Sequence, residues 1–260
     1  IGSEKKFNLL NELDSIDITS ETKVIRADIS QTHSFKPSYS TGDRTRSFLK
    51  IQDGCDYVCS FCTIPLARGK SRNDSIKKTI QLANQAIQEG AKELVLTGVN
   101  IGDFGKSSNE SFLSLIQELD KLDIERLRIS SIEPNLLSKE IINFCSSSKK
   151  FMPHFHIPLQ SGSDKILTLM RRRYKRSTYL ECVKMIKNVI PDATIGADVI
   201  VGFPGESDKD FVETVQFIDK LKISYLHVFT YSERSNTDAT KLDNKVDNKT
   251  RAKRSAILRK

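Results

Sequence analysis

The stretch that decides the fold is residues 48–62, which read FLKIQDGCDYVCSFC. A short apolar run is followed by a polar turn and then by three cysteines within eight residues, Cys55, Cys59 and Cys62. A strand over residues 48–52 would deliver this cysteine loop at its carboxyl end. In sheets of parallel strands, that is the end where ligands and chemistry are found.

The spacing of the three cysteines, C-x3-C-x2-C, indicates metal ligation, because the chain has an odd total of five cysteines and three of them are crowded together. A loop of this length can wrap three corners of a cubane and leave its fourth iron without a protein ligand. Structural zinc prefers four ligands, and no fourth cysteine or histidine lies nearby in sequence. We predict an open [4Fe–4S] cluster, with zinc or incidental thiols as alternatives. Cys145 and Cys182 continue apolar helix faces and are predicted to be buried.

Downstream of the cysteines, apolar runs alternate strictly with amphipathic segments. Further strands are predicted at residues 93–97, 126–130, 154–158, 194–202 and 225–230. Helices are predicted near residues 75–88, 111–121, 139–146, 164–170 with 178–189, and 209–221, with Asn73 or Asp74, Ser138 and Ser207 as N-caps. Alternation of this kind implies parallel strands with crossover helices. About six units predict an α/β fold, a partial (β/α)6 barrel open on one side.

The composition points to a polyanionic partner. The 260 residues include 41 Lys and Arg against 33 Asp and Glu, a formal net charge of +8. Such an excess favours RNA or DNA ahead of an anionic membrane, although a basic protein without such a partner stays open. No apolar run approaches the ~20 residues of a membrane span. We expect a cytoplasmic monomer with no membrane partner.

Candidate binding residues follow the predicted strands, where a ligand would meet them. They are Gly98 and Asn100 after the second strand, Glu133 after the third, Gln160 and Ser161 after the fourth, Arg172 beyond the next helix, and Gly202 after the fifth. The alternatives are a plain turn for the Gly98 loop, a rim ion pair for Glu133 and a solvated face for the basic run at 171–176. His154 and His156 share one face, but a structural or site-lining role is favoured over metal binding.

The C-x3-C-x2-C motif directly after the first strand of a (β/α) unit resembles the radical S-adenosylmethionine superfamily. The resemblance implies that the amino and carboxylate groups of S-adenosylmethionine chelate the open iron, and that an electron from the cluster generates a 5′-deoxyadenosyl radical. It places the backbone of Phe61 near the adenine, a core role being the alternative. It also brings the Gly98 loop to the methionine amino group and the Gly202 stretch to the adenine. Arg172 is the candidate for a carboxylate or ribose contact.

Five stretches together resemble the methylthiotransferases of that superfamily: KIQDGCDY at 50–57, CTIPLARG at 62–69, PLQSGS at 158–163, MRRRY at 170–174 and VGFPGE at 201–206. The wording at 63–72 is most similar to the branch that acts on N6-threonylcarbamoyladenosine beside the tRNA anticodon. The isopentenyladenosine branch and the ribosomal-protein aspartate branch are alternatives. The resemblance implies methylthio insertion at C2 of the adenine, with two S-adenosylmethionine molecules and an external electron donor such as flavodoxin or ferredoxin.

The same resemblance divides the chain. Residues 1–43 are expected to be a remnant of an N-terminal methylthiotransferase domain plus a linker, 44–240 the radical core, and 241–260 a basic helix leading to a missing RNA-binding domain. The family carries three more cysteines for a second, sulfur-delivering cluster, and no cysteine precedes Cys55 here. A non-catalytic, cluster-bearing RNA-binding module is the competing class. Predicted tRNA contacts are Arg171, Arg173, Lys175, Arg176, Lys253 and Arg254.

Overall fold

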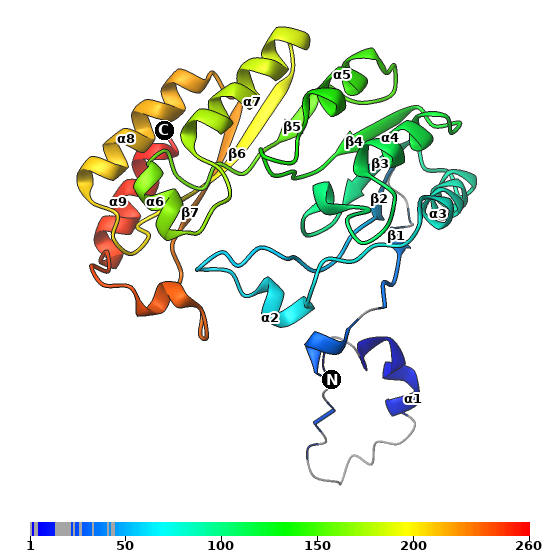
Figure 1. Cartoon of the computed structure of the whole chain (residues 1–260), viewed down its shortest axis with the longest axis horizontal. Coiled ribbons are helices and arrows are strands. Elements are labelled where there is room, and N and C mark those ends of the chain that lie inside the picture. Colours follow the sequence, from blue (N-terminus) through cyan, green and yellow to red (C-terminus); the bar gives the residue numbers. More distant parts are fainter. Residues whose placement is uncertain are drawn as a thin grey trace.

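The computed structural model describes residues 2, 5–13, 22, 24–25, 28–32, 34–40, 42 and 45–260. Within them, six parallel strands curve around a central loop, and most of the helices lie on the outside of that curve (Figure 1). The strands are β2 (Arg46–Lys50), β3 (Glu93–Thr97), β4 (Arg126–Ile129), β5 (His154–His156), β6 (Thr194–Val201) and β7 (Tyr225–Thr230). This arrangement confirms the predicted α/β fold with a partial, open barrel.

The strands form two sheets, β1-β2-β3-β4 and β5-β6-β7. Single parallel bridges, Leu127 to Phe151 and Ser131 to His156, join the two sheets between β4 and β5. At the opposite edge the short β1 (Ser38–Tyr39) runs antiparallel to β2. β1 falls within residues 1–43, which the sequence assigned to a domain remnant plus a linker and of which residues 33, 41 and 43, among others, lie outside the described residues.

Four of the crossover helices begin where serine side chains cap them. Ser75, Ser111, Ser138 and Ser207 each accept a hydrogen bond from a backbone N–H of the first turn. The predicted caps Ser138 and Ser207 are confirmed, whereas Asn73 or Asp74 was wrong, because Ser75 takes that role. The crossover helices are α3 (Ile76–Gln88), α4 (Phe112–Asp120), α5 (Lys139–Ser147), α6 (Asp164–Leu169), α7 (Arg176–Val189) and α8 (Asp208–Leu221). Of these, α6 and α7 begin without a side-chain cap.

The core lies between the strands and these outer helices. Leu49, Leu94 and Leu127 are fully buried at its centre. Cys145 and Cys182 are each 5% exposed on helix faces, as predicted, and burial raises the pKa of both thiols to about 12. Among the described residues, no helix combines the length and apolarity that crossing a bilayer requires.

Three helices lie outside the alternating pattern. α1 (Leu9–Leu13) follows a 3-10 turn (Lys5–Asn8) and lies apart from the α/β body in Figure 1. α2 (Ile64–Arg68) follows the cysteines directly, and the sequence did not predict it. α9 (Asn248–Leu258) corresponds to the predicted C-terminal basic helix and packs on β7.

Candidate active site

The cysteine loop leaves β2 through a turn that only glycine fits. Gly54 has φ +71°, and a Cβ there would lie 2.0 Å from the carbonyl oxygen of Lys70. Backbone hydrogen bonds join the two ends of the loop. The N–H of Cys55 donates to the carbonyl of Gly69 at 3.1 Å, and Asp53 and Arg72 each donate an N–H to the other's carbonyl. The loop is therefore pinned at its base.

A buried carboxylate also joins the two ends of the loop. Asp53 contacts Lys50 at 2.9 Å and both Arg68 and Arg72 at 3.1 Å, and its Oδ1 accepts from Gly54 N–H at 2.9 Å. Burial acts to raise the pKa of Asp53, but the hydrogen bond and charge of Lys50, together with Gly54 N–H and Arg72, hold it below its ordinary value. The ionised carboxylate thus ties both ends of the loop together. The sequence did not single out these residues.

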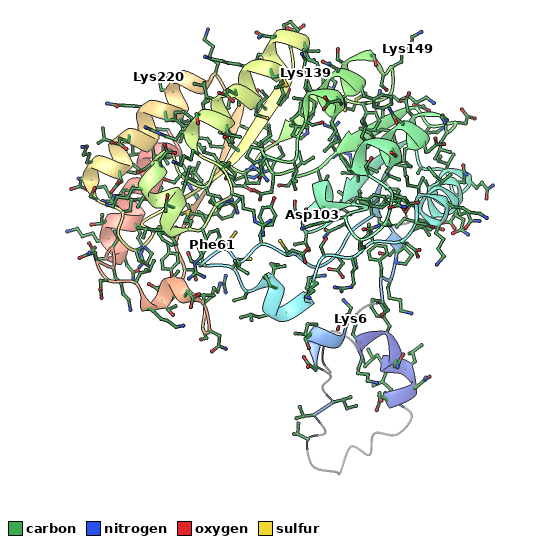
Figure 2. The ribbon with its side chains drawn as sticks, in the orientation of Figure 1. Lys6, Phe61, Asp103, Lys139, Lys149 and Lys220 are labelled. Atoms are coloured by element: carbon green, nitrogen blue, oxygen red, sulfur yellow. The ribbon has the colours of Figure 1, made fainter. Side chains whose placement is uncertain are left out.

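The far end of the loop reaches the second half of the barrel. Ser60 Oγ donates to Leu169 at 2.7 Å, and its carbonyl accepts from Ala239 N–H at 2.8 Å. Phe61 meets Phe203 edge to face at 6.2 Å between ring centroids. Figures 1 and 2 show this loop, with Phe61, crossing the mouth between the two sheets. The loop is fixed at both ends and presents its cysteines between them.

The three cysteines line one cavity of about 730 Å³. Most of the predicted cofactor residues line the same cavity: Phe61, Gly98, Asn100, Glu133, Gln160 and Arg172. Ser161 and Gly202 have other surroundings. Ser161 is 1% exposed and bonds within the α6–α8 contact, and Gly202 packs against the side chain of Arg251. The structure therefore brings six of the eight predicted cofactor residues together with the cysteines.

Gln52 joins the cysteine loop to the Gly98 loop, and the sequence analysis missed it. Its side chain is fully buried. The amide nitrogen donates to the carbonyls of Asp53 and Gly54 at 3.0 and 2.8 Å, and the amide oxygen accepts from the N–H groups of Val99 and Asn100 at 2.9 and 2.8 Å. A Cβ at Gly98 would lie 2.9 Å from this oxygen. The available signal was an amide side chain at the end of an apolar strand.

Arg172 places a buried positive charge beside the second cysteine. Its side chain is 5% exposed, its Nη1 donates to Cys59 Sγ at 3.2 Å, and its Nη2 forms an ion pair with Glu133. Burial raises the pKa of Glu133, and the charge of Arg172 opposes that rise. Glu133 therefore pairs with an arginine, as the sequence left open, but this ion pair is buried against Cys59 and does not lie on the rim.

Burial disfavours the free thiolate at two of the three cysteines. Burial raises the pKa of Cys55 to about 11, and it also raises that of Cys59 against the opposing charge of Arg172. At neutral pH such thiols keep their protons unless a metal ion replaces them.

We predict that Arg172→Gln destabilises the chain by about 3–5 kcal/mol, because it leaves the buried carboxylate of Glu133 without its partner. S-adenosylmethionine affinity of the cluster-loaded chain should fall at least about tenfold, the value of one charge-assisted hydrogen bond. Urea unfolding and equilibrium dialysis measure the two effects. The double variant Arg172→Gln/Glu133→Gln should regain stability but not affinity. Recovery of both would make Arg172 a purely structural residue.

The predicted RNA-contact residues differ in how far their side chains are exposed to solvent. Arg171 forms an exposed ion pair with Asp238, and Arg173 lies 4.0 Å over the Tyr57 ring. Arg254 differs from the prediction, because its side chain is 6% exposed and bonds to Glu206 and Asp208 at 2.6 and 2.8 Å. The guanidinium of Arg254 is paired with these two carboxylates, so it is not available to bind a phosphate. Lys175, Arg176 and Lys253 are at least partly exposed.

Comparison with known proteins agrees with this geometry. Residues 49–218 match the family described as the Radical SAM superfamily. The chain is 39% identical over 263 residues to the threonylcarbamoyladenosine tRNA methylthiotransferase MtaB of Aquifex aeolicus, covering 100% of this chain and 64% of that protein. It is 43% identical over 208 residues to the protein of the same name from Bacillus subtilis, covering 79% of this chain and 46% of that protein.

The other modified-adenosine branch is also among the relatives. The chain is 41% identical over 215 residues to the tRNA-2-methylthio-N(6)-dimethylallyladenosine synthase of Syntrophus aciditrophicus, covering 82% of this chain and 47% of that protein. The chain thus spans about half to two thirds of the length of these curated relatives.

Solved structures share the fold at low sequence identity. The radical S-adenosylmethionine methyltransferase TsrM of Kitasatospora setae superposes with a TM-score of 0.60 at 14% identity, covering 71% of this chain and 35% of that one. Coproporphyrinogen III oxidase HemN of Escherichia coli gives a TM-score of 0.58 at 15% identity, covering 79% and 49%. At such identities the likeness concerns the open barrel alone.

Proposed function

Since the chain belongs to the radical S-adenosylmethionine superfamily, we propose that it carries the radical step of methylthio transfer to N6-threonylcarbamoyladenosine in tRNA. The observation that carries this proposal is the single cavity lined by Cys55, Cys59 and Cys62 together with Arg172 and Glu133. The relatives named as threonylcarbamoyladenosine tRNA methylthiotransferases support the substrate. An external donor such as flavodoxin or ferredoxin and a cytoplasmic location accompany the proposal.

The residues of the cavity fit the two cofactors. Three thiols on one loop are soft ligands suited to an iron–sulfur cluster with one open iron. The volume of about 730 Å³ lies within the ordinary range of small-molecule sites. Asn100 lines the cavity, and its buried Oδ1 lacks a hydrogen-bond partner among the described residues. An unpaired acceptor of this kind suits the ammonium group of the methionine moiety.

Each side chain has a definite task in this proposal. The cluster, when bound, supplies the electron that cleaves S-adenosylmethionine to methionine and a 5′-deoxyadenosyl radical. Arg172 donates to Cys59 Sγ and so favours the thiolate form needed for iron ligation. Gln52 holds the Gly98 loop at a set distance from the cysteine loop. Phe61 and Phe203 pack together at the loop's far end and exclude water there.

We predict that the anaerobically reconstituted and reduced chain converts S-adenosylmethionine into 5′-deoxyadenosine and methionine in equal amounts, as measured by liquid chromatography with mass spectrometry. This result separates an enzyme from a non-catalytic RNA-binding module with the same cluster. Intact S-adenosylmethionine after incubation with fully cluster-loaded, reduced chain would exclude the radical function.

The substrate is tested separately, by mass spectrometry of tRNA nucleosides from a strain lacking the gene. We expect the 2-methylthio derivative of N6-threonylcarbamoyladenosine to disappear and its unmodified precursor to accumulate, with both restored by the gene. Loss of the 2-methylthio isopentenyladenosine derivative instead would assign the chain to that branch, and an unchanged tRNA profile would favour the ribosomal-protein branch.

The proposed tRNA contacts are Arg171, Arg173, Lys175, Arg176 and Lys253. Binding through phosphate contacts should weaken steeply with salt. We predict that Lys175→Gln and Lys253→Gln each reduce the slope of log affinity against log salt by about one. Lys149→Gln is the matched control, because Lys149 lies on the far side of the molecule, beyond α5 (Figure 2). Equal effects from all three variants, in filter binding over a salt series, would indicate non-specific attraction only.

A further inference from the structure

A second group of metal-ligating side chains lies on the inner face of the β5-β6-β7 sheet. His156 on β5 and His227 on β7 flank Asp198 on β6. Asp198 Oδ1 is 3.0 Å from His156 Nε2 and 3.2 Å from His227 Nδ1, and the three donor atoms lie within 4.8 Å of one another. The cluster is assembled by register, because Asp198 pairs with His227 across the sheet, while His156 pairs with Gly196, two residues before Asp198.

Two of these separations, 3.0 and 3.2 Å from Asp198 Oδ1, match those between the ligand atoms of a metal ion. Bonds of about 2.0–2.1 Å to a first-row metal place donor atoms roughly 2.8–3.0 Å apart at octahedral angles and roughly 3.3–3.4 Å apart at tetrahedral angles. Two imidazoles and one carboxylate form a donor set that such ions prefer. Without metal, each imidazole can donate its N–H to the same oxygen of Asp198, so a metal ion would replace two hydrogen bonds and require little rearrangement.

A neighbouring tyrosine orients the first imidazole. Tyr225 Oη lies 3.1 Å from His156 Nδ1, the ring nitrogen that does not face Asp198, and 2.9 Å from His154 Nε2. Metal-bound histidines usually have their second nitrogen held in this way, which sets the tautomer and the ring plane. Gly196 makes room for Tyr225, because a Cβ there would lie 2.1 Å from the phenol ring.

The cluster also leaves room for a ligand that the protein does not supply. The side chain of His227 is 56% exposed and that of Asp198 23%. Asp198 lines a second cavity of about 300 Å³, whose other walls include Phe61 and Gln160. Both of these residues also line the cavity of the cysteines. A metal here would have an open position beside the candidate active site.

We propose that His156, Asp198 and His227 bind one divalent first-row metal ion, with zinc as the best-suited species. Three protein ligands with an open fourth position are the pattern of zinc sites that bind water or substrate rather than of closed structural ones. None of the three ligands lies on the cysteine loop, and the site requires neither the cluster nor the tRNA reaction.

The test is zinc uptake by the cluster-loaded chain, in which iron already occupies the cysteines. The protein is treated with chelator, titrated with Zn²⁺ and gel-filtered. It should then retain one zinc ion per chain in addition to the iron of the cluster. Zinc-edge X-ray absorption should show nitrogen and oxygen ligands near ~2.0 Å and no sulfur near ~2.3 Å. His227→Ala and Asp198→Asn should abolish this equivalent, and Tyr225→Phe should weaken binding by about 10- to 100-fold.

Because His227 is exposed, His227→Ala removes little packing and should fold normally. Loss of zinc in this variant would therefore report the loss of a ligand and not a failure to fold. His154→Gln is the matched control and should retain the zinc, since His154 contacts Tyr225 but not the three donors. Zinc that persists in both His227→Ala and Asp198→Asn, zinc bound by sulfur, or a wild-type chain that retains no zinc would each overturn the proposal and leave a hydrogen-bonded cluster.

Discussion

Replacing any one of Cys55, Cys59 or Cys62 with alanine should abolish cluster assembly and, with it, 5′-deoxyadenosine formation. The wild-type chain should contain about four iron and four sulfide after anaerobic reconstitution, the stoichiometry of a cubane. The loss should be near complete for each variant, because three thiolates are the whole protein ligand set of a cluster with one open iron. Iron and sulfide analysis, visible absorption and product assay measure it together.

Cys145→Ala and Cys182→Ala are the matched controls. Both thiols are buried on helix faces away from the cavity, so each variant should keep its cluster and activity and lose only about 1 kcal/mol of stability. A reconstituted wild type with stoichiometric zinc and no visible absorption would refute the cluster assignment. A cluster that survives in Cys55→Ala, Cys59→Ala or Cys62→Ala would refute the ligand set.

Gln52→Leu should lower both the stability of the fold and the affinity for the cofactor. The leucine keeps most of the volume but removes the acceptor of two N–H groups, that of the buried Asn100 and that of the half-buried Val99. An orphaned buried N–H, as at Asn100, costs about 1–3 kcal/mol and the half-buried N–H of Val99 costs less, so the expected loss is about 1–4 kcal/mol by urea unfolding. S-adenosylmethionine affinity should fall as well, because the Gly98 loop is released from the cysteine loop.

Gln81→Leu is the control for the same chemical change on an exposed helix position of α3, where the expected effect is within about 0.5 kcal/mol. If Gln52→Leu has the wild-type urea midpoint of unfolding and binds S-adenosylmethionine normally, then the hydrogen bonds of Gln52 between the two loops contribute nothing to stability or to cofactor binding.

Local patterns in the sequence were sufficient to predict much of the fold. Runs such as Glu93–Thr97 alternate with amphipathic segments, and that alternation predicts parallel strands with crossover helices wherever it occurs. The cysteine spacing and the residues after each strand pointed to one end of the sheet, where the structure places Glu133, Arg172 and Asn100 around one cavity. Parallel strands make this inference possible, because their carboxyl ends meet at one edge.

Other features were beyond such reasoning. The two-residue β1 has too little pattern to be recognised. Arg254 looked like a free positive charge because its helix is basic, but the helix docks with that face inward against Glu206. Burial of a charged side chain depends on partners distant in sequence, which composition does not reveal.

The sequence by itself determined the order of the six parallel strands and their crossover helices, the C-x3-C-x2-C loop and the burial of Cys145 and Cys182, because these depend on periodicity and spacing along the chain. Only the tertiary structure decided that Gln52 holds two loops together, that Arg172 stands between Glu133 and Cys59, and that His156, Asp198 and His227 converge. Each of these contacts joins residues from different strands or loops. Their distances follow from strand register and the curvature of the sheet, which no local stretch of sequence specifies.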